Sequence, residues 1–353
     1  MKKKQRISAL FLPCILALLL LLTSCGERTD KYVIHSLDLF DTATTITGYA
    51  PNQETFDRIS GEILTQLEEY HRLFTIYHRY DGMENLCTVN EVQNGAHRTV
   101  TVDQRIIDML LYAKEMYEVT DGHLNIAMGS VLSIWHDYRT AGLNEPWAAE
   151  LPTSEMLAEA AQHTNIDHLV IDAENKTVWI ADPQMTLDVG AVAKGYAVEM
   201  VARSLEERGI SGYVINVGGN VRTIGTKPNG EMWLAGIENP DTKSDSPYLV
   251  YLQLAGESVV TSGSYQRYYT VGNRNYHHII DPKTQMPAEG YLSVSVICKN
   301  SAAGDALSTA LFCMSLEEGL ALVESLPDTE ALWVMPDHTQ RTSDGFHRHI
   351  TQS

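Results

Sequence analysis

Residues 187–209 constrain the fold more than any other stretch, because they specify a sharp turn followed by a helix. The stretch begins with Asp188, turns at Gly190, and then has apolar residues at helical spacing, at 192, 196, 198, 201 and 205. Gly209 follows as a C-terminal cap. A glycine corner before a helix leaves backbone N–H groups free, and such groups bind phosphate. Two interpretations stay open: a capped helix with a surface lysine, or a site where Asp188 orients a polar ligand and Lys194 meets an anion.

The first 25 residues are typical of a bacterial lipoprotein signal. Four basic residues lie among the first six, an apolar run follows over 7–22, and Leu-Thr-Ser precedes Cys25. The apolar run is shorter than the ~20 residues of a membrane span. The box around Cys25 resembles that of lipoproteins, which implies cleavage before Cys25 and its lipidation, for example by palmitate. An ordinary signal peptide or an uncleaved anchor is the alternative.

These features predict an exported protein, lipid-anchored to the outer face of the bacterial cytoplasmic membrane. Residues 26–32 would form a polar tether, and residues 33–353 would form the folded domain. Of the five cysteines, Cys87, Cys298 and Cys313 remain in that domain. Their number is odd and their spacing is not that of a zinc site, so buried free thiols are expected, although one disulfide stays open.

The chain is strongly acidic, which bears on its partners. Its 353 residues carry 45 acidic and 26 basic side chains, a formal net charge of −19. Such an excess of negative charge disfavours nucleic acid as a partner. An anionic ligand would therefore need nearby positive charge from a metal ion or from helix termini.

Short β-branched segments occur beside amphipathic helices, with many hairpins and few regular βαβ units, which predicts an α+β fold of largely antiparallel sheets and packed helices. Strands are expected at 33–37, 44–48, 168–171, 177–180, 212–216, 233–237, 248–254, 258–261, 268–271, 276–280, 292–298 and 330–335. Helices are expected after Asn52 to residue 74, from Asp103 to about 120, over 153–163, after the corner at Gly190, and at 302–314 and 316–326. Residues 85–90 and 141–150 read as loops.

Five ordered motifs concentrate glycine, acidic, histidine and hydroxyl residues where a plain core would not need them. They read D-V-G-A-V-A-K-G-Y (188–196), N-V-G-G-N (216–220), T-S-G-S-Y-Q-R (261–267), H-H-I-I-D-P-K-T (277–284) and G-D-A-L-S-T-A (304–310). Together they resemble the ApbE family of bacterial FAD:protein FMN transferases. The resemblance covers residues 39–333, and five motifs in family order are far more specific than any one of them.

The resemblance implies a transferase that splits the FAD pyrophosphate, attaches FMN through a phosphoester to a Ser or Thr of an acceptor flavoprotein, and releases AMP. It implies Mg²⁺ held by the Ala191 carbonyl, Asp305 and Thr309, the last two lying i, i+4 on one helix face. It makes His278 the general base and places Asp188 with it as catalytic. Because adjacent strand residues point to opposite faces, only one of His277 and His278 is expected to face the site.

The residues expected to bind FAD come from several parts of the chain. They are Phe40, Asp41, Thr42, His123, Leu124, Asn125, Asp188, Lys194, Asn216, Gly218, Gly219, Thr261, Ser262, Gly263, Arg267 and His278. Residues 40–42 stand where the family has Met-Gly-Thr, and residues 122–126 where it has Gly-x-Phe-Asp-Pro. Both segments touch the flavin side in the family. Gln285 and Gly304 also replace a family glycine and alanine.

Simpler interpretations stand beside this one. Asp305 alone could cap the helix that follows it. The whole chain could be a lipoprotein that binds FAD without turnover, or a magnesium-dependent pyrophosphatase that converts FAD to FMN and AMP. A general base at His278 beside an intact metal pair favours the enzymes, because a carrier does not require them.

Overall fold

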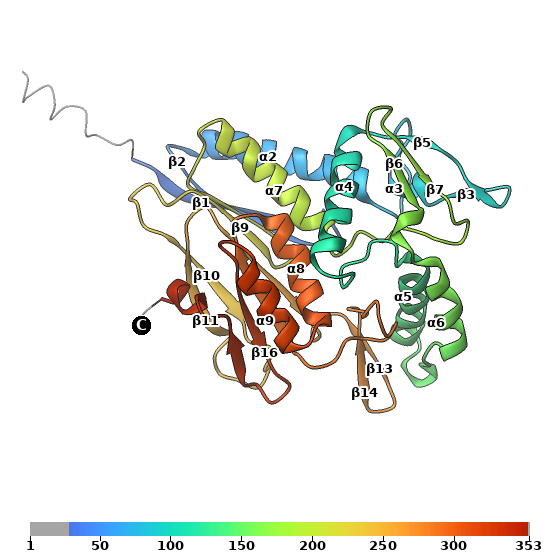
Figure 1. Ribbon diagram of the computed structural model, residues 1–353. Helices are drawn as coiled ribbons and strands as arrows, with labels where there is room; N and C mark the ends of the chain where they lie inside the picture. The colour runs from blue at the N-terminus through green and yellow to red at the C-terminus, as the bar shows by residue number, and fades with distance from the viewer. Residues whose placement is uncertain (1–27, 352–353) are drawn as a thin grey trace, which may run out of the picture.

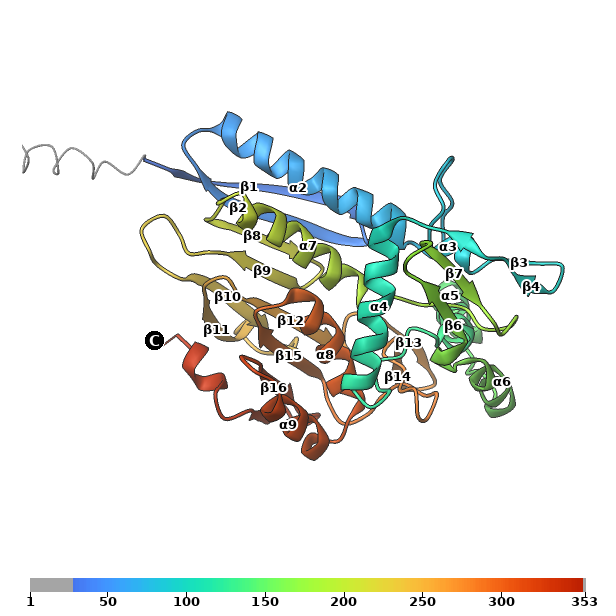
Figure 2. The same ribbon diagram turned by 45° about the horizontal axis from the view of Figure 1, so that its top comes forward.

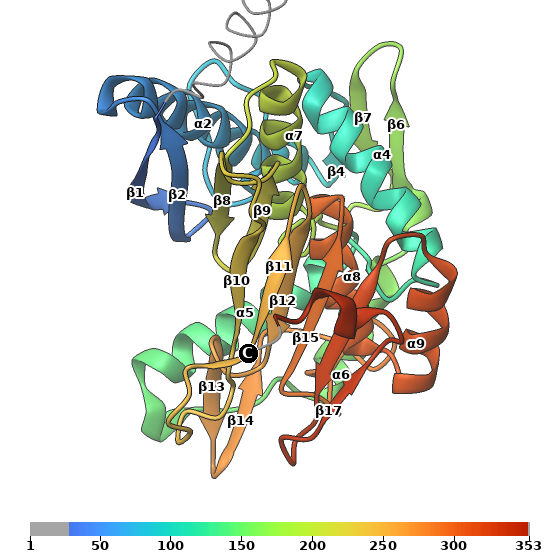
Figure 3. The same ribbon diagram turned by 90° about the vertical axis from the view of Figure 1, so that its left-hand side faces the viewer.

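The computed structural model describes residues 28–351, and its centre is an eight-stranded sheet (Figures 1 and 3). Every neighbouring pair in it is antiparallel, as predicted. Its strand order is β1 (Asp30–Leu39), β2 (Thr42–Ala50), β8 (Tyr213–Val217), β9 (Asn220–Ile224), β12 (Ser258–Gly263), β15 (Ser293–Cys298), β16 (Glu330–Val334) and β17 (Gln340–Thr342). Strand β1 begins inside the segment predicted as a tether. The predicted signal and Cys25 lie outside the described residues.

A layer of helices covers one face of this sheet (Figure 2). It contains α2 (Gln53–Phe74), α7 (Ala193–Glu207), α8 (Ser301–Cys313) and α9 (Leu316–Ser325). Helix α2 begins where predicted, because the Asn52 side chain accepts a hydrogen bond from the backbone N–H of Thr55. Its apolar stripe, including Ile63 and Leu67, is buried against the sheet and α7.

The opposite face of the sheet is only partly covered. The hairpin of β10 (Trp233–Glu238) and β11 (Tyr248–Leu254) packs there, with Ile237 and Leu252 against Val259 and Ile297. On β2 and β8, side chains alternate between the two faces. Ile46 and Ile215 enter the core under the helices, whereas Thr45 and Asn216 point into a hollow on the other side.

Two smaller groups of elements complete the structure. Helix α4 (Gln104–Val119) lies next to a three-stranded sheet of β5 (Val100–Thr101), β7 (Thr177–Ile180) and β6 (Leu169–Asp172). Helices α5 (Gly129–Asn144) and α6 (Ser154–Ala160) lie beside the hairpin of β13 (Tyr268–Val271) and β14 (Arg274–His277) (Figure 1). Trp135 and Tyr269 pack in the core of this second group, and the Trp135 indole N–H donates to the Gln285 carbonyl at 2.8 Å.

Several local predictions were wrong. Residues 86–89 form the short helix α3 (Leu86–Val89), because Asn85 and Thr88 make a reciprocal capping box. Helix α5 was not anticipated, and its last residues, through Asn144, were expected to be loop. The small hairpin of β3 (Val92–Gln93) and β4 (Ala96–His97) and strand β9 were not anticipated.

The predictions about thiols are partly confirmed. Cys87, Cys298 and Cys313 are free, but only Cys298 is fully buried. In the part of the chain that the structure describes, no helix has both the length and the apolar character needed to cross a bilayer.

Candidate active site

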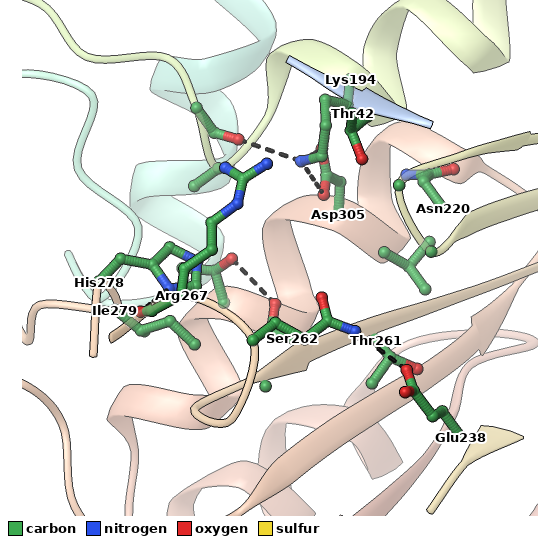
Figure 4. A pocket seen from close by; sticks show the side chains of 18 of the residues that line it. Thr42, Lys194, Asn220, Glu238, Thr261, Ser262, Arg267, His278, Ile279 and Asp305 are labelled. Carbon is green, nitrogen blue, oxygen red and sulfur yellow. Dashed lines mark hydrogen bonds and ion pairs between the residues drawn. The ribbon is translucent and has the colours of Figure 1, made fainter. Parts of the chain in front are cut away.

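The hollow on the uncovered face of the sheet is a cavity of about 940 Å³, within the range that encloses cofactor-sized ligands. Its floor comes from β2, β8, β9 and β12, and its walls come from β10, α5 and the loops around residues 188–194 and 264–282. Figure 4 shows its central side chains. Within the described residues, all five sequence motifs therefore contribute side chains to one cavity.

The corner before α7 is held rigidly. The Asp188 carboxylate accepts the Gly190 N–H at 2.9 Å, and the Asp188 N–H donates to the Ile126 carbonyl at 2.8 Å. Burial raises the pKa of Asp188 above its ordinary value, even though the Gly190 N–H opposes this. The corner thus places the Asp188 carboxyl group at the cavity wall, where it ionises less readily than an exposed aspartate.

The start of α7 offers fewer free N–H groups than expected from the sequence. The N–H groups of Val192 and Ala193 donate to the Val189 carbonyl, and that of Gly195 donates to the Asp305 carboxylate at 2.8 Å. A side chain from α8 therefore takes the place predicted for a phosphate. Gly195 is required here, because a Cβ would lie 2.4 Å from the Asp305 Cβ and 2.5 Å from the Ser301 carbonyl oxygen.

Asp305 is the charged centre of the site. It is 4% exposed, and its Oδ1 lies 3.1 Å from the Lys194 ammonium (Figure 4). Helix α8 begins at Ser301 and is capped by Asn300, whose side chain accepts the Ala302 N–H at 2.9 Å. Asp305 therefore lies in the second turn, which excludes the helix-cap interpretation.

Thr309 lies one turn after Asp305, and both line the cavity together with Ala191. The Thr309 hydroxyl oxygen lies 3.3 Å from that of Ser262, so a hydroxyl-rich edge of β12 adjoins this position. The three predicted ligand groups are a carboxylate, a hydroxyl and a carbonyl. That oxygen set fits Mg²⁺, which proteins often hold with one or two carboxylates and substrate phosphates. Residues 28–351 contain no cluster of three or more His, Cys, Asp or Glu side chains arranged for a metal.

The glycine loop after β8 is a two-residue hairpin turn. Gly218 and Gly219 have φ of 56° and 86°, values that favour glycine at both central positions of a type I′ turn. The Asn216 side chain accepts the Gly219 N–H at 3.1 Å. A Cβ on Gly218 would also lie 2.5 Å from the Thr42 hydroxyl oxygen, so the loop approaches β2 closely.

Asn220 joins the cavity to a buried network behind it. Its side-chain oxygen is hydrogen-bonded to the Ser301 hydroxyl, and its buried Nδ2 has no partner within the described protein. The Ser301 N–H donates to the Glu199 carboxylate at 2.9 Å. Glu199 also pairs with the buried Arg222 at 3.2 Å, so this network joins α7, β9 and the start of α8.

His278 is held as a neutral ring. Its Nδ1 lies 3.2 Å from the Arg267 carbonyl, which can only accept, so Nδ1 carries the proton and Nε2 keeps a free lone pair. Burial, followed by the charges of Arg267 and Arg139, lowers the pKa of His278 to about 3. The ring is therefore uncharged at neutral pH.

Both His277 and His278 contribute to the cavity lining, so the lining alone does not separate them. Strand β14 ends at His277, so the alternation of a strand does not continue to the next residue. The two nonetheless differ. His277 Nε2 donates to the Ala288 carbonyl at 2.8 Å and its Nδ1 accepts the Ile279 N–H at 3.2 Å, so both of its nitrogens are engaged within the protein.

The residues predicted for the flavin side are only partly brought together. Thr42, His123, Leu124 and Asn125 line the cavity, whereas Phe40 and Asp41 do not. Both have positive φ in the β1–β2 turn, and the Phe40 N–H donates to His71 Nδ1 at 3.1 Å, which holds this turn against α2. Asp41 contributes through its carbonyl, which accepts from Arg267 at 3.3 Å. Thr261, Ser262, Gly263 and Arg267 all line the cavity as predicted.

The motifs missed several cavity residues because these lie on elements outside them. Glu238 on β10 accepts from the Tyr265 hydroxyl at 3.3 Å and from the Gln266 amide at 3.0 Å. The Tyr77 and His136 rings lie 5.7 Å apart between centroids. For His136 and Arg139 a signal existed, since helical spacing puts them on one face with Leu132. No sequence pattern around Tyr77 or Glu238 indicated that either residue would line the cavity.

Comparisons with known proteins place this geometry in context. The model of the ApbE family matches residues 40–333. An FAD:protein FMN transferase of Klebsiella pneumoniae is 32% identical over 274 residues, which cover 74% of this chain and 81% of that protein. The enzyme of the same name from Treponema pallidum is 31% identical over 262 residues, 70% of each chain.

Solved structures agree in fold. The crystal structure of the ApbE protein of Thermotoga maritima has a TM-score of 0.77 at 27% identity and covers 92% of this chain and all of that one. The flavin transferase ApbE of Vibrio cholerae has a TM-score of 0.74 at 25% identity, covering 91% of this chain and all of that one. The α+β fold expected from the sequence is thus confirmed.

Proposed function

The chain belongs to the ApbE family, and from this membership we propose how its cavity moves FMN from FAD to a protein. It is a transferase of the FAD:protein FMN type. One observation carries the proposal about the site. A single cavity contains the Lys194–Asp305 pair, Thr309 and a histidine with a free lone pair.

The substrate phosphates would lie between the Lys194–Asp305 pair and Arg267. The protein as a whole is acidic, so two negative phosphates need local positive charge, which Arg267 supplies because the charge of Lys194 is balanced by Asp305. Lys194 is three-quarters buried at 24% side-chain exposure, and its ammonium lies within 3.3 Å of both Asp305 oxygens and 3.2 Å of the Gly190 carbonyl. Those contacts hold the ammonium at the cavity wall, ready for a phosphate oxygen.

Asp305, Thr309 and the Ala191 carbonyl would hold Mg²⁺ in this cavity. When bound, the ion neutralises pyrophosphate charge and stabilises the departing AMP phosphate. The protein's own part is to present one buried carboxylate whose second oxygen is already fixed by the Gly195 N–H at 2.8 Å. That bond sets the orientation of the carboxylate before any ligand arrives.

His278 would accept the proton of the acceptor hydroxyl. As the Ser or Thr oxygen forms its bond to the FMN phosphorus, the bond from that phosphorus to the bridging oxygen breaks, and AMP leaves with that oxygen. The hydroxyl proton passes to Nε2, because Nδ1 already donates to the Arg267 carbonyl. The products are AMP and a protein carrying FMN in a phosphoester.

We also propose where the enzyme acts and on which partners. Lipidation at Cys25 would tether the enzyme to the outer face of the cytoplasmic membrane, where it would meet exported flavoprotein acceptors. Strand β1 begins at Asp30, so few residues separate the tether point from the folded domain. The enzyme would therefore act close to the membrane surface.

The test supplies purified protein with FAD, Mg²⁺ and an acceptor domain, and measures AMP by chromatography and bound flavin by in-gel fluorescence. We expect both products to form together, and to be lost with EDTA or with an acceptor whose Ser or Thr is replaced by Ala. Release of AMP and FMN without an acceptor would instead indicate a pyrophosphatase. Binding of FAD without AMP release would indicate a carrier.

A further inference from the structure

Helix α5 presents an arginine to the cavity that none of the family motifs contains. Leu132, His136 and Arg139 follow one another at spacings of four and three residues, so they share a helix face, and all three line the cavity. Arg139 is half-buried, and its guanidinium lies 3.2 Å from His136 Nδ1. The arginine is thus held with its charge toward the cavity.

Arg267 approaches the same cavity from the loop after β12. Its guanidinium donates to the Asp41 carbonyl at 3.3 Å, which anchors it from the β1–β2 turn. Within residues 28–351, neither Arg139 nor Arg267 has a carboxylate at ion-pair distance. This is notable in a chain with 45 acidic and 26 basic side chains.

The two arginine charges act on the same region. Burial, and then the charge of Arg267, lowers the pKa of Arg139, and both arginines contribute to the low pKa of His278. Two like charges directed into one partly buried space repel each other, and an anion between them removes that repulsion. Both arginines line the cavity and, among the described residues, neither is paired with a carboxylate, which favours an anionic ligand beside His278.

We propose that Arg139 and Arg267 together bind the phosphate of the FMN half of FAD, the group that is transferred. This inference rests on the proposed function for the identity of the anion. The FMN phosphate is the fitting group because the acceptor hydroxyl must attack its phosphorus, and His278 beside both arginines accepts the hydroxyl proton. A guanidinium can hold two phosphate oxygens at once, and it stabilises the charge that collects on them during transfer.

The test compares flavins that differ only in phosphate. Riboflavin, FMN and FAD are titrated against the full-length protein, its Arg139→Ala and Arg139→Lys variants, and Thr140→Ala as a control, with flavin fluorescence as readout. Thr140 is the exposed neighbour of Arg139 on α5 and does not line the cavity. Melting temperatures check that each variant is folded.

We expect Arg139→Ala to weaken FMN binding about tenfold while riboflavin binding stays within about twofold, because one charge-assisted contact is lost. Arg139→Lys should recover only part of the FMN affinity, since an ammonium cannot bind two oxygens in the same way. The rate of FMN transfer should fall further than FMN affinity, by about a hundredfold in Arg139→Ala.

Three results would overturn the inference. An equal loss for riboflavin and FMN would mean that Arg139 contacts the ring system. Unchanged FMN affinity with a raised KM for the acceptor would mean that it binds the acceptor protein. Unchanged binding and transfer would exclude any role. If the unsubstituted protein binds FMN but does not transfer it, the proposed function fails, whereas a selective loss of FMN binding in Arg139→Ala still supports the phosphate site.

Discussion

The substitution Asp305→Asn isolates the charge of the proposed metal ligand. Asparagine has nearly the same size, and its carboxamide oxygen can still accept the Gly195 N–H that Asp305 accepts at 2.8 Å. What disappears is the negative charge that lies 3.1 Å from the Lys194 ammonium. The fold should therefore persist while the site loses its one buried carboxylate among the predicted ligands.

The stability loss should be modest. Removing one partner of a fully buried ion pair costs about 3–5 kcal/mol. The Lys194 side chain is 24% exposed, against 5% for Asp305, so its ammonium can turn toward water. We therefore expect a loss of about 1–2 kcal/mol, half or less of the buried-pair value, and a melting temperature lower by a few degrees.

The activity loss should be far larger. A metal ion stabilises phosphoryl-transfer charge by several kcal/mol, so the rate of AMP release should fall about a thousandfold at a fixed low Mg²⁺ concentration. Higher Mg²⁺ should restore part of that rate, because the remaining oxygen groups still bind the ion weakly. The assay is a Mg²⁺ titration of AMP release and of flavin attachment.

Asp328→Asn is the matched control, because Asp328 also pairs with a lysine, at 2.8 Å from Lys299, but is 65% exposed. It should change neither the melting temperature nor the Mg²⁺ titration. A wild-type rate in Asp305→Asn would refute the proposed ligand set. So would a large loss of rate with an unchanged Mg²⁺ requirement.

Three further predictions test other parts of the structure. Gly195→Ala should push α7 away from α8, because the added Cβ would lie 2.4 Å from the Asp305 Cβ. Both the melting temperature and the affinity for FAD should fall. An FAD affinity equal to that of the wild-type protein, measured by titration, would contradict this. Glu199→Gln should lower stability by about 2–4 kcal/mol in urea unfolding, because Glu199 and Arg222 are 3% and 4% exposed and their pair would be broken; an unchanged midpoint would count against the network. The pKa of His278 is about 3 in the folded chain and near 6.5 in the unfolded chain, so the unfolded state binds more protons between these pH values. The contribution of this ring to the free energy of unfolding is therefore fully present above about pH 6.5 and is lost as the pH falls toward about 3. The transfer rate should accordingly show no inflection near pH 6.5. An inflection near that pH in the wild-type protein that is absent in His278→Gln would contradict this prediction.

Much of the fold followed from local patterns. The cap at Asn52 and the apolar stripe of α2 located that helix, and the turn at Gly190 located the start of α7. The motifs predicted that Lys194, Asp305 and Thr309 lie together, and all three line one cavity. These features depend on residues close in sequence or on a shared family pattern.

The remainder depends on contacts between distant segments. Helix α3 is too short to be stable alone, and it forms because the Asn85 amide also donates to the carbonyls of Arg72 and His78. The N–H of Gly195 is not free for phosphate, because Asp305 comes from 110 residues away to accept it. Arg139 contributes to the cavity only through the packing of α5. Spacing within one segment can put Arg139 on a helix face with Leu132 and His136, but it cannot show which cavity that face meets.

The proposed reaction of this cavity moves FMN from FAD to another protein. The most direct measurement is the intact mass of an acceptor domain after incubation with the enzyme, FAD and Mg²⁺, alongside a chromatographic measurement of AMP. The acceptor should gain the mass of one FMN less one water, with one AMP released for each. An acceptor of unchanged mass, under conditions in which the folded enzyme binds FAD, would contradict it.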